Sequence, residues 1–226
     1  MTVLFNANTR SAYQAGYYTG ALTIGDLLAH GDVGLGALDG NDGELVIDGG
    51  RAYRTAADGS TSEVPPEATT PYATVVPFTA DCSFPVSATD RAGVERLLAA
   101  SLPLVNRTWA LRIHGSFEFV AAGASQRQQP PYAPLEEVMA TYRYLRHTQT
   151  TGTLVAFHCP AYLTGIDYVG AHYHWLSQDR TQGGHVATDA DFAVCNAVVE
   201  ACEATSYTVE LPTDEAFHEL DLTPYH

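Results

Sequence analysis

Three histidines lie close together in the segment GAHYHWLSQDRTQGGHV, residues 170–186. His172 and His174 are two residues apart, so on a β-strand both side chains would project from one face. If residues 177–184 connect this strand to a returning one, His185 begins the second strand and can lie opposite the pair. Three neutral imidazoles arranged in this way would fill three positions of a tetrahedral zinc ion. The fourth would stay open to water or substrate, as in catalytic zinc sites.

Two other interpretations of this histidine cluster remain open from spacing alone. Nine of the 226 residues are histidine, so one closely spaced pair is a weak sign, and the three side chains could simply be hydrogen-bonded on a polar sheet face. A glycine before the pair and Asp179 after it are also similar to a cupin metal motif, although the second half of that motif is not visible. A closed structural zinc site is disfavoured, because no cysteine lies in the segment.

The charge of the chain limits what it can bind. Its formal net charge is -15, and all 11 basic residues are arginine. A field of this sign repels the phosphates of nucleic acids and anionic lipid surfaces, so neither is an expected partner. With 46% hydrophobic residues the chain is expected to be globular. An anionic substrate would need a local positive centre, such as a metal ion or an arginine.

The sequence gives no sign of export or of membrane insertion. Its first 20 residues contain no basic region followed by an apolar run, and no stretch approaches the roughly 18 apolar residues that span a bilayer. The four cysteines have no CxxC spacing and are expected to be reduced and structural, as small buried hydrophobes: Cys82, Cys159, Cys195 and Cys202. A cytoplasmic location is therefore expected.

Helices are predicted in three segments. Residues 9–30 mix helix formers with an amphipathic pattern and contain a short helix capped by Thr9, residues 89–102 form a helix capped by Thr89, and residues 134–147 form another that starts near a proline. The second of these places four apolar side chains on one face, namely Val94, Leu97, Leu98 and Leu102.

Strands are predicted around these helices. Gly49-Gly50 should form the turn of a hairpin, residues 74–78 (TVVPF) should form an edge strand because proline cannot donate to a ladder, and residues 108–122 alternate as a strand. Residues 190–202 suit either a strand or one face of a helix. The remaining strand-like segments are 152–162, 166–176, 183–202 and 206–212. The pattern predicts an α+β fold with two β-sheet subdomains and few helices, divided into residues 1–128 and 129–226.

Four segments resemble conserved blocks of the acetolactate decarboxylase family. They are HGDVGLGALDGNDGEL (30–45), RIHGSF (112–117), PYAPLEEV (131–138) and the long segment that ends in the histidine cluster (152–186). The resemblance implies two α/β domains with zinc in a cleft, usually in a homodimer. It also implies that zinc binds neighbouring carbonyl and hydroxyl oxygens of the substrate and stabilises the enediolate left by loss of carbon dioxide.

The resemblance assigns roles to four residues. His172, His174 and His185 would hold the zinc ion. Glu44, in the Asp-Gly-Glu triplet, matches a family active-site carboxylate and would carry a proton or hydrogen-bond to a zinc-bound oxygen.

The chain departs from the family in charged residues. The family has an arginine at the position of Gly123, and the nearest candidates to replace it are Arg112 and Arg127, which could bind a substrate carboxylate. A family glutamate lies in a C-terminal segment beyond Leu211-Pro212, and the sequence stops at His226, before that position.

Two further differences could reshape the pocket. Ala37 replaces a threonine, and His158 replaces an apolar or aromatic residue before a proline. His158 could act as a new acid or base, or it could be a histidine of the core or one that supports the site.

Three functions follow. The first is a zinc-dependent lyase that acts on a β-keto or α-hydroxy-β-keto substrate through a metal-stabilised enolate or enediolate. The second, favoured by the missing arginine, is the same chemistry redirected to cyclisation, isomerisation or aldol-type reaction of a larger keto compound in specialised metabolism. The third is a binding protein with an inactive site, which the presence of Glu44 disfavours.

Overall fold

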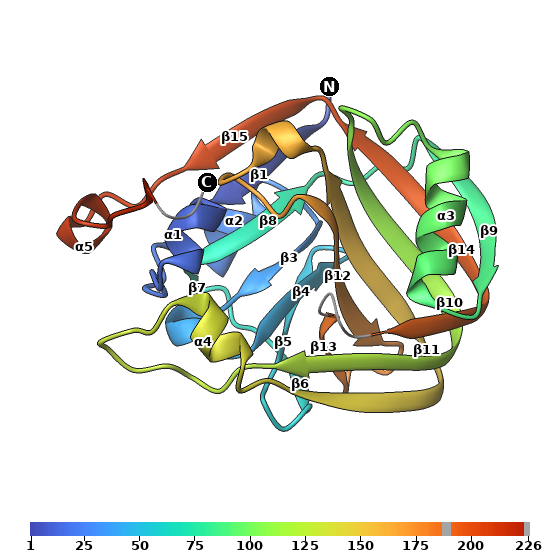
Figure 1. Ribbon diagram of the computed structural model, residues 1–226, viewed down its shortest axis with the longest axis horizontal. Helices are drawn as coiled ribbons and strands as arrows, with labels where there is room; N and C mark the ends of the chain where they lie inside the picture. The colour runs from blue at the N-terminus through green and yellow to red at the C-terminus, as the bar shows by residue number, and fades with distance from the viewer. Residues whose placement is uncertain (187–190, 224–226) are drawn as a thin grey trace.

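A computed structural model describes residues 1–186 and 191–223, and within them the strands build two large sheets (Figure 1). The seven-stranded sheet has the order β15 (Ser206–Glu210), β1 (Val3–Ala7), β8 (Tyr72–Val76), β3 (Val33–Ala37), β4 (Glu44–Asp48), β5 (Arg51–Thr55) and β6 (Thr61–Glu63). The six-stranded sheet has the order β11 (Arg143–Cys159), β12 (Gly170–Ser177), β13 (Gly183–Val186), β10 (Thr108–Ala124), β14 (Phe192–Ala204) and β9 (Cys82–Ala88).

The helices and remaining elements are short, except for α3. They comprise α1 (Arg10–Gln14), α2 (Ile24–Leu28), α3 (Arg91–Ser101), α4 (Leu135–Met139) and α5 (Glu215–His218), the 3-10 turns η1 (Asp39–Asn41) and η2 (Ala161–Leu163), and a small sheet of β2 (Leu22–Thr23) and β7 (Thr69–Thr70). The expected α+β class is confirmed.

Part of the six-stranded sheet closes on itself. Strand β11 pairs with β12 on one side and with β10 on the other, and β10 also pairs with β13. These four strands therefore form a ring. Both large sheets take strands from either side of residue 128, since β9 and β10 join the second sheet and β15 joins the first. The division into subdomains at that position stays a prediction.

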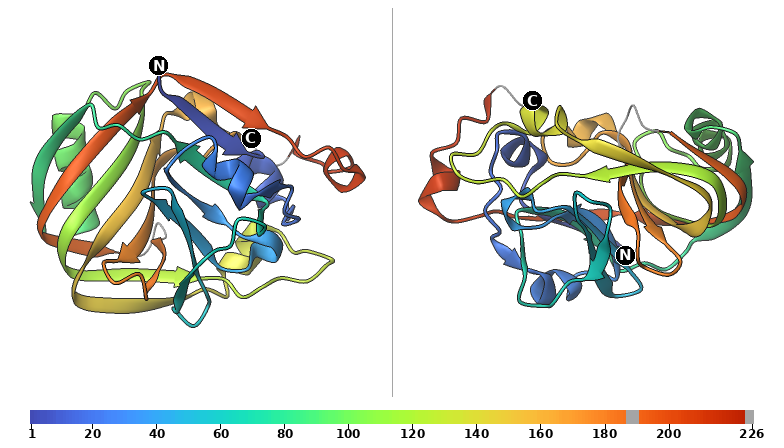
Figure 2. Two further views of the ribbon diagram at one scale, coloured as in Figure 1. Left: turned by 180° about the vertical axis from the view of Figure 1, so that it is seen from behind. Right: turned by 90° about the horizontal axis from the view of Figure 1, so that it is seen from below.

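The two large sheets share one apolar core. Leu4, Val33 and Val46 of the seven-stranded sheet pack with Val155 and Phe157 of the other. Helix α3 packs against the opposite face of the six-stranded sheet, as the two views of Figure 2 show. The six-stranded sheet is thus covered on both faces, and the side chains on its inner face meet those of β3 and β4.

The helix predictions are confirmed in two segments and wrong in much of the third. Thr9 caps α1 by accepting from the amide of Ala12. Helix α3 lies inside 89–102, although Asp90 rather than Thr89 is its cap and Leu97 is 40% exposed. Only residues 135–139 of 134–147 are helical. From Arg143 onward the chain is strand β11, because pairing with the long β10 outweighs the helical preference of this segment.

The strand predictions hold with one correction among the described residues, and residues 187–190, which fall in a predicted strand-like segment, lie outside the described part of the chain. Gly49 and Gly50 form the turn between β4 and β5, with φ of 63° and 75° that suit glycine. Residues 192–204 are the strand β14. The predicted edge strand at 74–78 is wrong, because β8 lies between β1 and β3. That strand ends at Val76, so Pro77 removes no hydrogen bond from the sheet.

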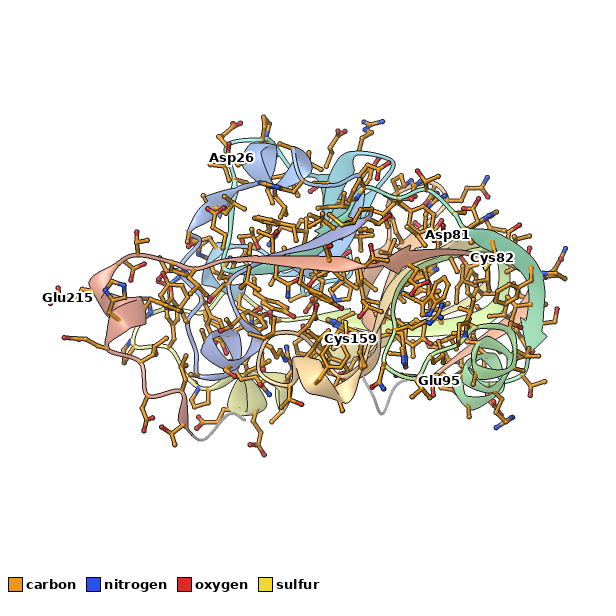
Figure 3. The ribbon with its side chains drawn as sticks, turned by 90° about the horizontal axis from the view of Figure 1, so that it is seen from above. Asp26, Asp81, Cys82, Glu95, Cys159 and Glu215 are labelled. Carbon is orange, nitrogen blue, oxygen red and sulfur yellow. The ribbon has the colours of Figure 1, made fainter. Side chains whose placement is uncertain are left out.

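All four cysteines are unpaired, as expected, but only Cys159 and Cys202 are buried. Figure 3 shows Cys159 in the interior and Cys82 on the outer strand β9. Cys82 and Cys195 are exposed, which corrects the expectation that all four are buried. Within the described parts of the chain, no helix is long and apolar enough to cross a bilayer.

Candidate active site with a three-histidine metal centre

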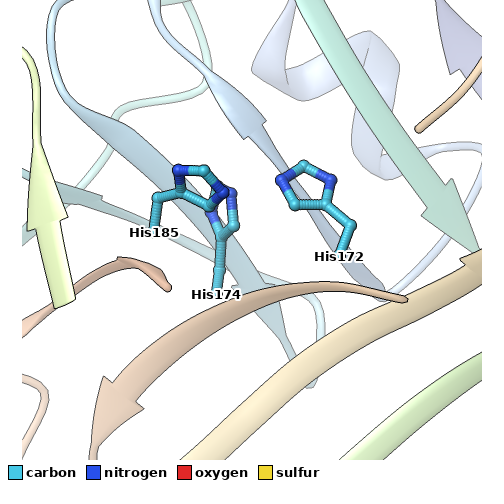
Figure 4. A group of neighbouring side chains, drawn as sticks. All are labelled: His172, His174 and His185. Atoms are coloured by element: carbon cyan, nitrogen blue, oxygen red, sulfur yellow. The ribbon is translucent and has the colours of Figure 1, made fainter. Parts of the chain in front are cut away.

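The three histidines meet between the sheets. Strands β12 and β13 form a hairpin in which His174 lies directly opposite His185. The nitrogens of His172, His174 and His185 that could bind a metal lie within 4.8 Å of one another, and Figure 4 shows the rings gathered together. The predicted strand, connecting segment and returning strand are therefore confirmed, and the three side chains converge as the spacing indicated.

Alternation along β12 explains why both of its histidines point the same way. His172, His174 and Leu176 face the seven-stranded sheet, whereas Tyr173 and Trp175 are fully buried in the other core beneath α3. The large aromatic side chains fix the register of the strand, because a shift by one residue would bring them out of their core.

Hydrogen bonding leaves one nitrogen of His174 available for a metal. Its Nδ1 lies 2.9 Å from the carbonyl oxygen of Leu45 on β4. A carbonyl only accepts, so Nδ1 donates and the lone pair lies on Nε2. The Nδ1 atom of His172 is buried and has no hydrogen-bond partner among the described residues. An unpartnered buried nitrogen in such a cluster fits a site built for a ligand.

The environment keeps the three imidazoles uncharged. Burial lowers the pKa of His174 to about 3. Burial, with repulsion from neighbouring histidines, also lowers the pKa values of His172 and His185. Neutral imidazole is the form that binds metal, so the cluster is ready to accept a cation at neutral pH without losing protons.

Glu44 lies beside the cluster. One carboxylate oxygen is 3.5 Å from Nε2 of His174, and the residue is 5% exposed. Burial raises the pKa of Glu44 to about 8, although the positive charge of Arg10 opposes the shift. A carboxyl with such a pKa holds a proton at neutral pH and can donate it.

A cavity of about 250 Å³ opens in front of the histidines. Arg10 and Tyr13 of α1 line one side, and Leu135 and Met139 of α4 line another. Tyrosine side chains supply much of the remaining wall, namely Tyr72, Tyr142 and Tyr168, together with Gly36. The cavity therefore combines three histidines that could hold a metal ion, a carboxyl group and a cation in one small space.

Several proteins that this chain resembles carry the name alpha-acetolactate decarboxylase. The family model of alpha-acetolactate decarboxylase matches residues 4–224. The chain is 36% identical over 222 residues to the alpha-acetolactate decarboxylase of Methylococcus capsulatus, covering 97% of this chain and 84% of that protein. It is 34% identical over 229 residues to that of Klebsiella aerogenes, covering 99% and 85%.

This chain belongs to the alpha-acetolactate decarboxylase family. The crystal structure of alpha-acetolactate decarboxylase from Bacillus subtilis strain 168 superposes with a TM-score of 0.92 at 28% identity, over 97% of this chain and 93% of that one. The alpha-acetolactate decarboxylase resemblance drawn from the sequence is confirmed over nearly the whole chain.

Two arginines that we considered as replacements for the family arginine lie elsewhere. Arg112 pairs with Asp48 at 2.8 Å and with Glu200 at 2.7 Å, so its guanidinium is already neutralised. Arg127 is half exposed and pairs with Asp39 at 2.5 Å. Neither lines the histidine cavity.

His158 also lies away from the cavity. Side chains two residues apart on a strand point to the same face. On β11, Leu154 and Ala156 share the face of His158 and pack in the core beneath α3. Val155 and Phe157 lie on the other face, which is that of the histidine cluster. Partial burial lowers the pKa of His158, so the side chain is a neutral histidine on the opposite face of the sheet.

Arg10 is the cavity residue that sequence reasoning missed. It is the first residue of α1, more than 160 positions before the nearest ligand histidine. Its type and local spacing carry no signal of this role, because the contact of α1 with the segment before β12, where the amide of Arg10 donates to the carbonyl of Ile166, forms only in the folded chain. The tyrosines of the wall were missed for the same reason.

Arg112 stabilises the fold instead, through Asp48. This carboxylate is 2% exposed and accepts from Arg112 of β10 and, at 2.7 Å, from Arg180 of the β12–β13 connection. It thereby ties the seven-stranded sheet to the six-stranded one.

Replacing Asp48 by alanine is expected to lower the free energy of unfolding by about 2–3 kcal/mol, since it leaves two partly buried guanidinium groups without their shared partner. Urea denaturation measures the change. Glu200→Gln, at a carboxylate 30% exposed, is the control and should cost less than about 1 kcal/mol. Equal losses in the two variants would contradict the role of Asp48.

Proposed function

We propose that this protein is a zinc-dependent acetolactate decarboxylase. The observation that carries the proposal is the convergence of His172, His174 and His185 beside the buried Glu44. Membership of the alpha-acetolactate decarboxylase family supports decarboxylation. The group of three histidines supports zinc as the metal.

Three imidazoles are a donor set that zinc accepts well. The buried Nδ1 of His172 and the oriented ring of His174 fit such an ion, so all three side chains would hold it. When bound, the ion would supply Lewis acidity toward oxygens of a hydroxyketone.

Decarboxylation of acetolactate breaks the bond between its carboxylate carbon and C2. The electron pair of that bond passes into the adjacent ketone group, carbon dioxide leaves, and one proton must then be added at C2 to give the hydroxyketone product. The Glu44 carboxyl, protonated near neutral pH, is the group that we assign to deliver this proton and to regain one from solvent.

The cavity favours acetolactate over the alternative of a larger keto substrate. Its volume of about 250 Å³ is below the ~300–1,000 Å³ of sites for drug-sized ligands. The presence of Arg10 also removes the argument that the site lacks a cation for an acidic substrate. A homodimer and a cytoplasmic location stay predictions.

Carbon dioxide release from racemic acetolactate tests the proposal. Protein stripped of metal by a chelator should release none above the spontaneous rate, and activity should rise with added zinc until one equivalent per chain is bound. Stoichiometric zinc without release would contradict decarboxylation and direct the search to the redirected chemistry. Release that is independent of metal would contradict the role of the histidine cluster.

A further inference from the structure

The guanidinium of Arg10 occupies the cavity without a protein anion to neutralise it. It lines the same cavity as the histidines and Glu44. Among the described residues, it has no ion pair or hydrogen bond, although the chain carries 26 acidic residues. Most other arginines pair with carboxylates, Arg112 and Arg127 among them. A cation without a counter-ion in a protein of net charge -15 is available to an anionic ligand.

Aromatic rings hold this guanidinium in place. Its central carbon lies 5.3 Å from the ring centre of Tyr168 and 5.8 Å from that of Tyr13. The ring of Tyr168 stacks on His172 at 4.8 Å, so one aromatic ring separates the cation from a metal ligand. The backbone amide of Arg10 donates to the carbonyl of Ile166 at 3.0 Å. Such contacts position a guanidinium while leaving its N–H donors unused.

A cation cannot take the position of Gly123 in this chain. Gly123 pairs with His185, so this position does border the metal centre. A Cβ atom there would lie 2.6 Å from the carbonyl oxygen of Arg143 and 3.1 Å from the ring of Tyr144. The close pairing of β10 and β11 therefore excludes a side chain at Gly123, whereas α1 brings a guanidinium to the cavity from another element.

We propose that Arg10 binds the carboxylate of the substrate and selects 2-hydroxy-3-keto acids over the corresponding neutral hydroxyketones. The proposal rests on the proposed function for the identity of the acid. A guanidinium offers paired N–H donors that match a carboxylate. Loss of that carboxylate as carbon dioxide removes the ion pair, so the neutral product should be held less tightly than the substrate.

Affinities for two stable ligands separate the role of Arg10 from catalysis. The first ligand is 2,3-dihydroxy-2-methylbutanoate, in which the ketone of acetolactate is reduced. The second is butane-2,3-diol, which lacks the carboxylate. Both are titrated by calorimetry into zinc-loaded protein, as wild type, Arg10→Met and Arg10→Lys. The control is Arg96→Met, since Arg96 is 73% exposed on α3 and its loss changes the net charge equally.

Arg10→Met is expected to weaken binding of the acid about 10- to 100-fold and to change binding of the diol less than about twofold. Arg10→Lys should recover part of the lost affinity, because it keeps the charge without the paired donors. For acetolactate, KM should rise by the same factor in Arg10→Met, with kcat changed less than about threefold. Arg96→Met should match wild type, and zinc content should stay constant throughout.

An unchanged ratio of acid to diol affinity in zinc-loaded Arg10→Met would overturn the inference, as would a wild type that does not prefer the acid. If Arg10→Met fails to fold, the ratio of acid to diol affinity is measured in Arg10→Lys, and a ratio equal to that of the wild type would overturn the inference. A wild type that prefers the acid through Arg10 but releases no carbon dioxide would refute the proposed decarboxylation and leave the carboxylate site standing.

Discussion

Replacing His174 by alanine is expected to abolish stoichiometric zinc binding and to lower carbon dioxide release by about 10³-fold or more. The side chain lies at the centre of the cluster, 1% exposed, and is oriented by the carbonyl of Leu45. Two remaining histidines form an incomplete site, and ligand loss removes both affinity and Lewis acidity. Metal analysis after gel filtration, together with a rate assay, measures the two effects.

A control variant at His114 and a second variant at His185 complete the test of the histidine cluster. His114→Ala removes a histidine on β10 whose side chain is 42% exposed and lies near Glu200, so it should retain full zinc and activity. If His174→Ala does not fold, the partly buried His185 gives the same test. A fully metallated and active variant at either position would refute the ligand assignment.

Glu44→Gln is expected to lower kcat by about 10²–10⁴-fold while zinc stays bound. The amide keeps the size and hydrogen-bonding capacity of the protonated carboxyl but cannot give up a proton to C2. Burial raises the pKa of Glu44 to about 8, which favours the protonated carboxyl that the neutral amide resembles. Zinc content, measured with the rate, separates an effect on the metal site from a loss of proton transfer.

The exposed Glu118→Gln on β10 is the control for this substitution and should leave the rate unchanged. Incorporation of solvent deuterium at C2 of the product adds a second readout. In the wild type one face should be labelled, whereas protonation from bulk water in Glu44→Gln should label both faces. A variant with the rate and stereochemistry of the wild type would exclude Glu44 as the proton donor.

The sequence predicted the convergence of the three histidines because its geometry is local. The period of two that aligns His172 with His174, and the short connection that returns His185, lie within one hairpin. Glu44 could be found only through family resemblance, since its pairing with the cluster depends on how β4 packs against β12 and β13.

Long-range packing explains why the arginine candidates and one predicted helix were wrong. Arg112 and Arg127 were chosen for nearness in sequence to Gly123, but both have acidic partners that only the folded chain brings to them. Arg10 comes from the opposite end of the chain. The helix predicted through residue 147 failed similarly, because a 17-residue partner strand determines the conformation of β11.

The site residues come from two sheets. The histidines that could bind a metal are thereby separated from the residues assigned to the substrate carboxylate and to the proton. All three histidines belong to the β12–β13 hairpin of the six-stranded sheet, whereas Glu44 and Arg10 come from the seven-stranded sheet and from α1 beside it. Under the proposed function, substitutions in the first 50 residues would alter which acid enters, or where a proton is delivered, with the three histidines unchanged. Such an arrangement would let the chemistry change through one half of the molecule while the histidine cluster in the other half stays the same.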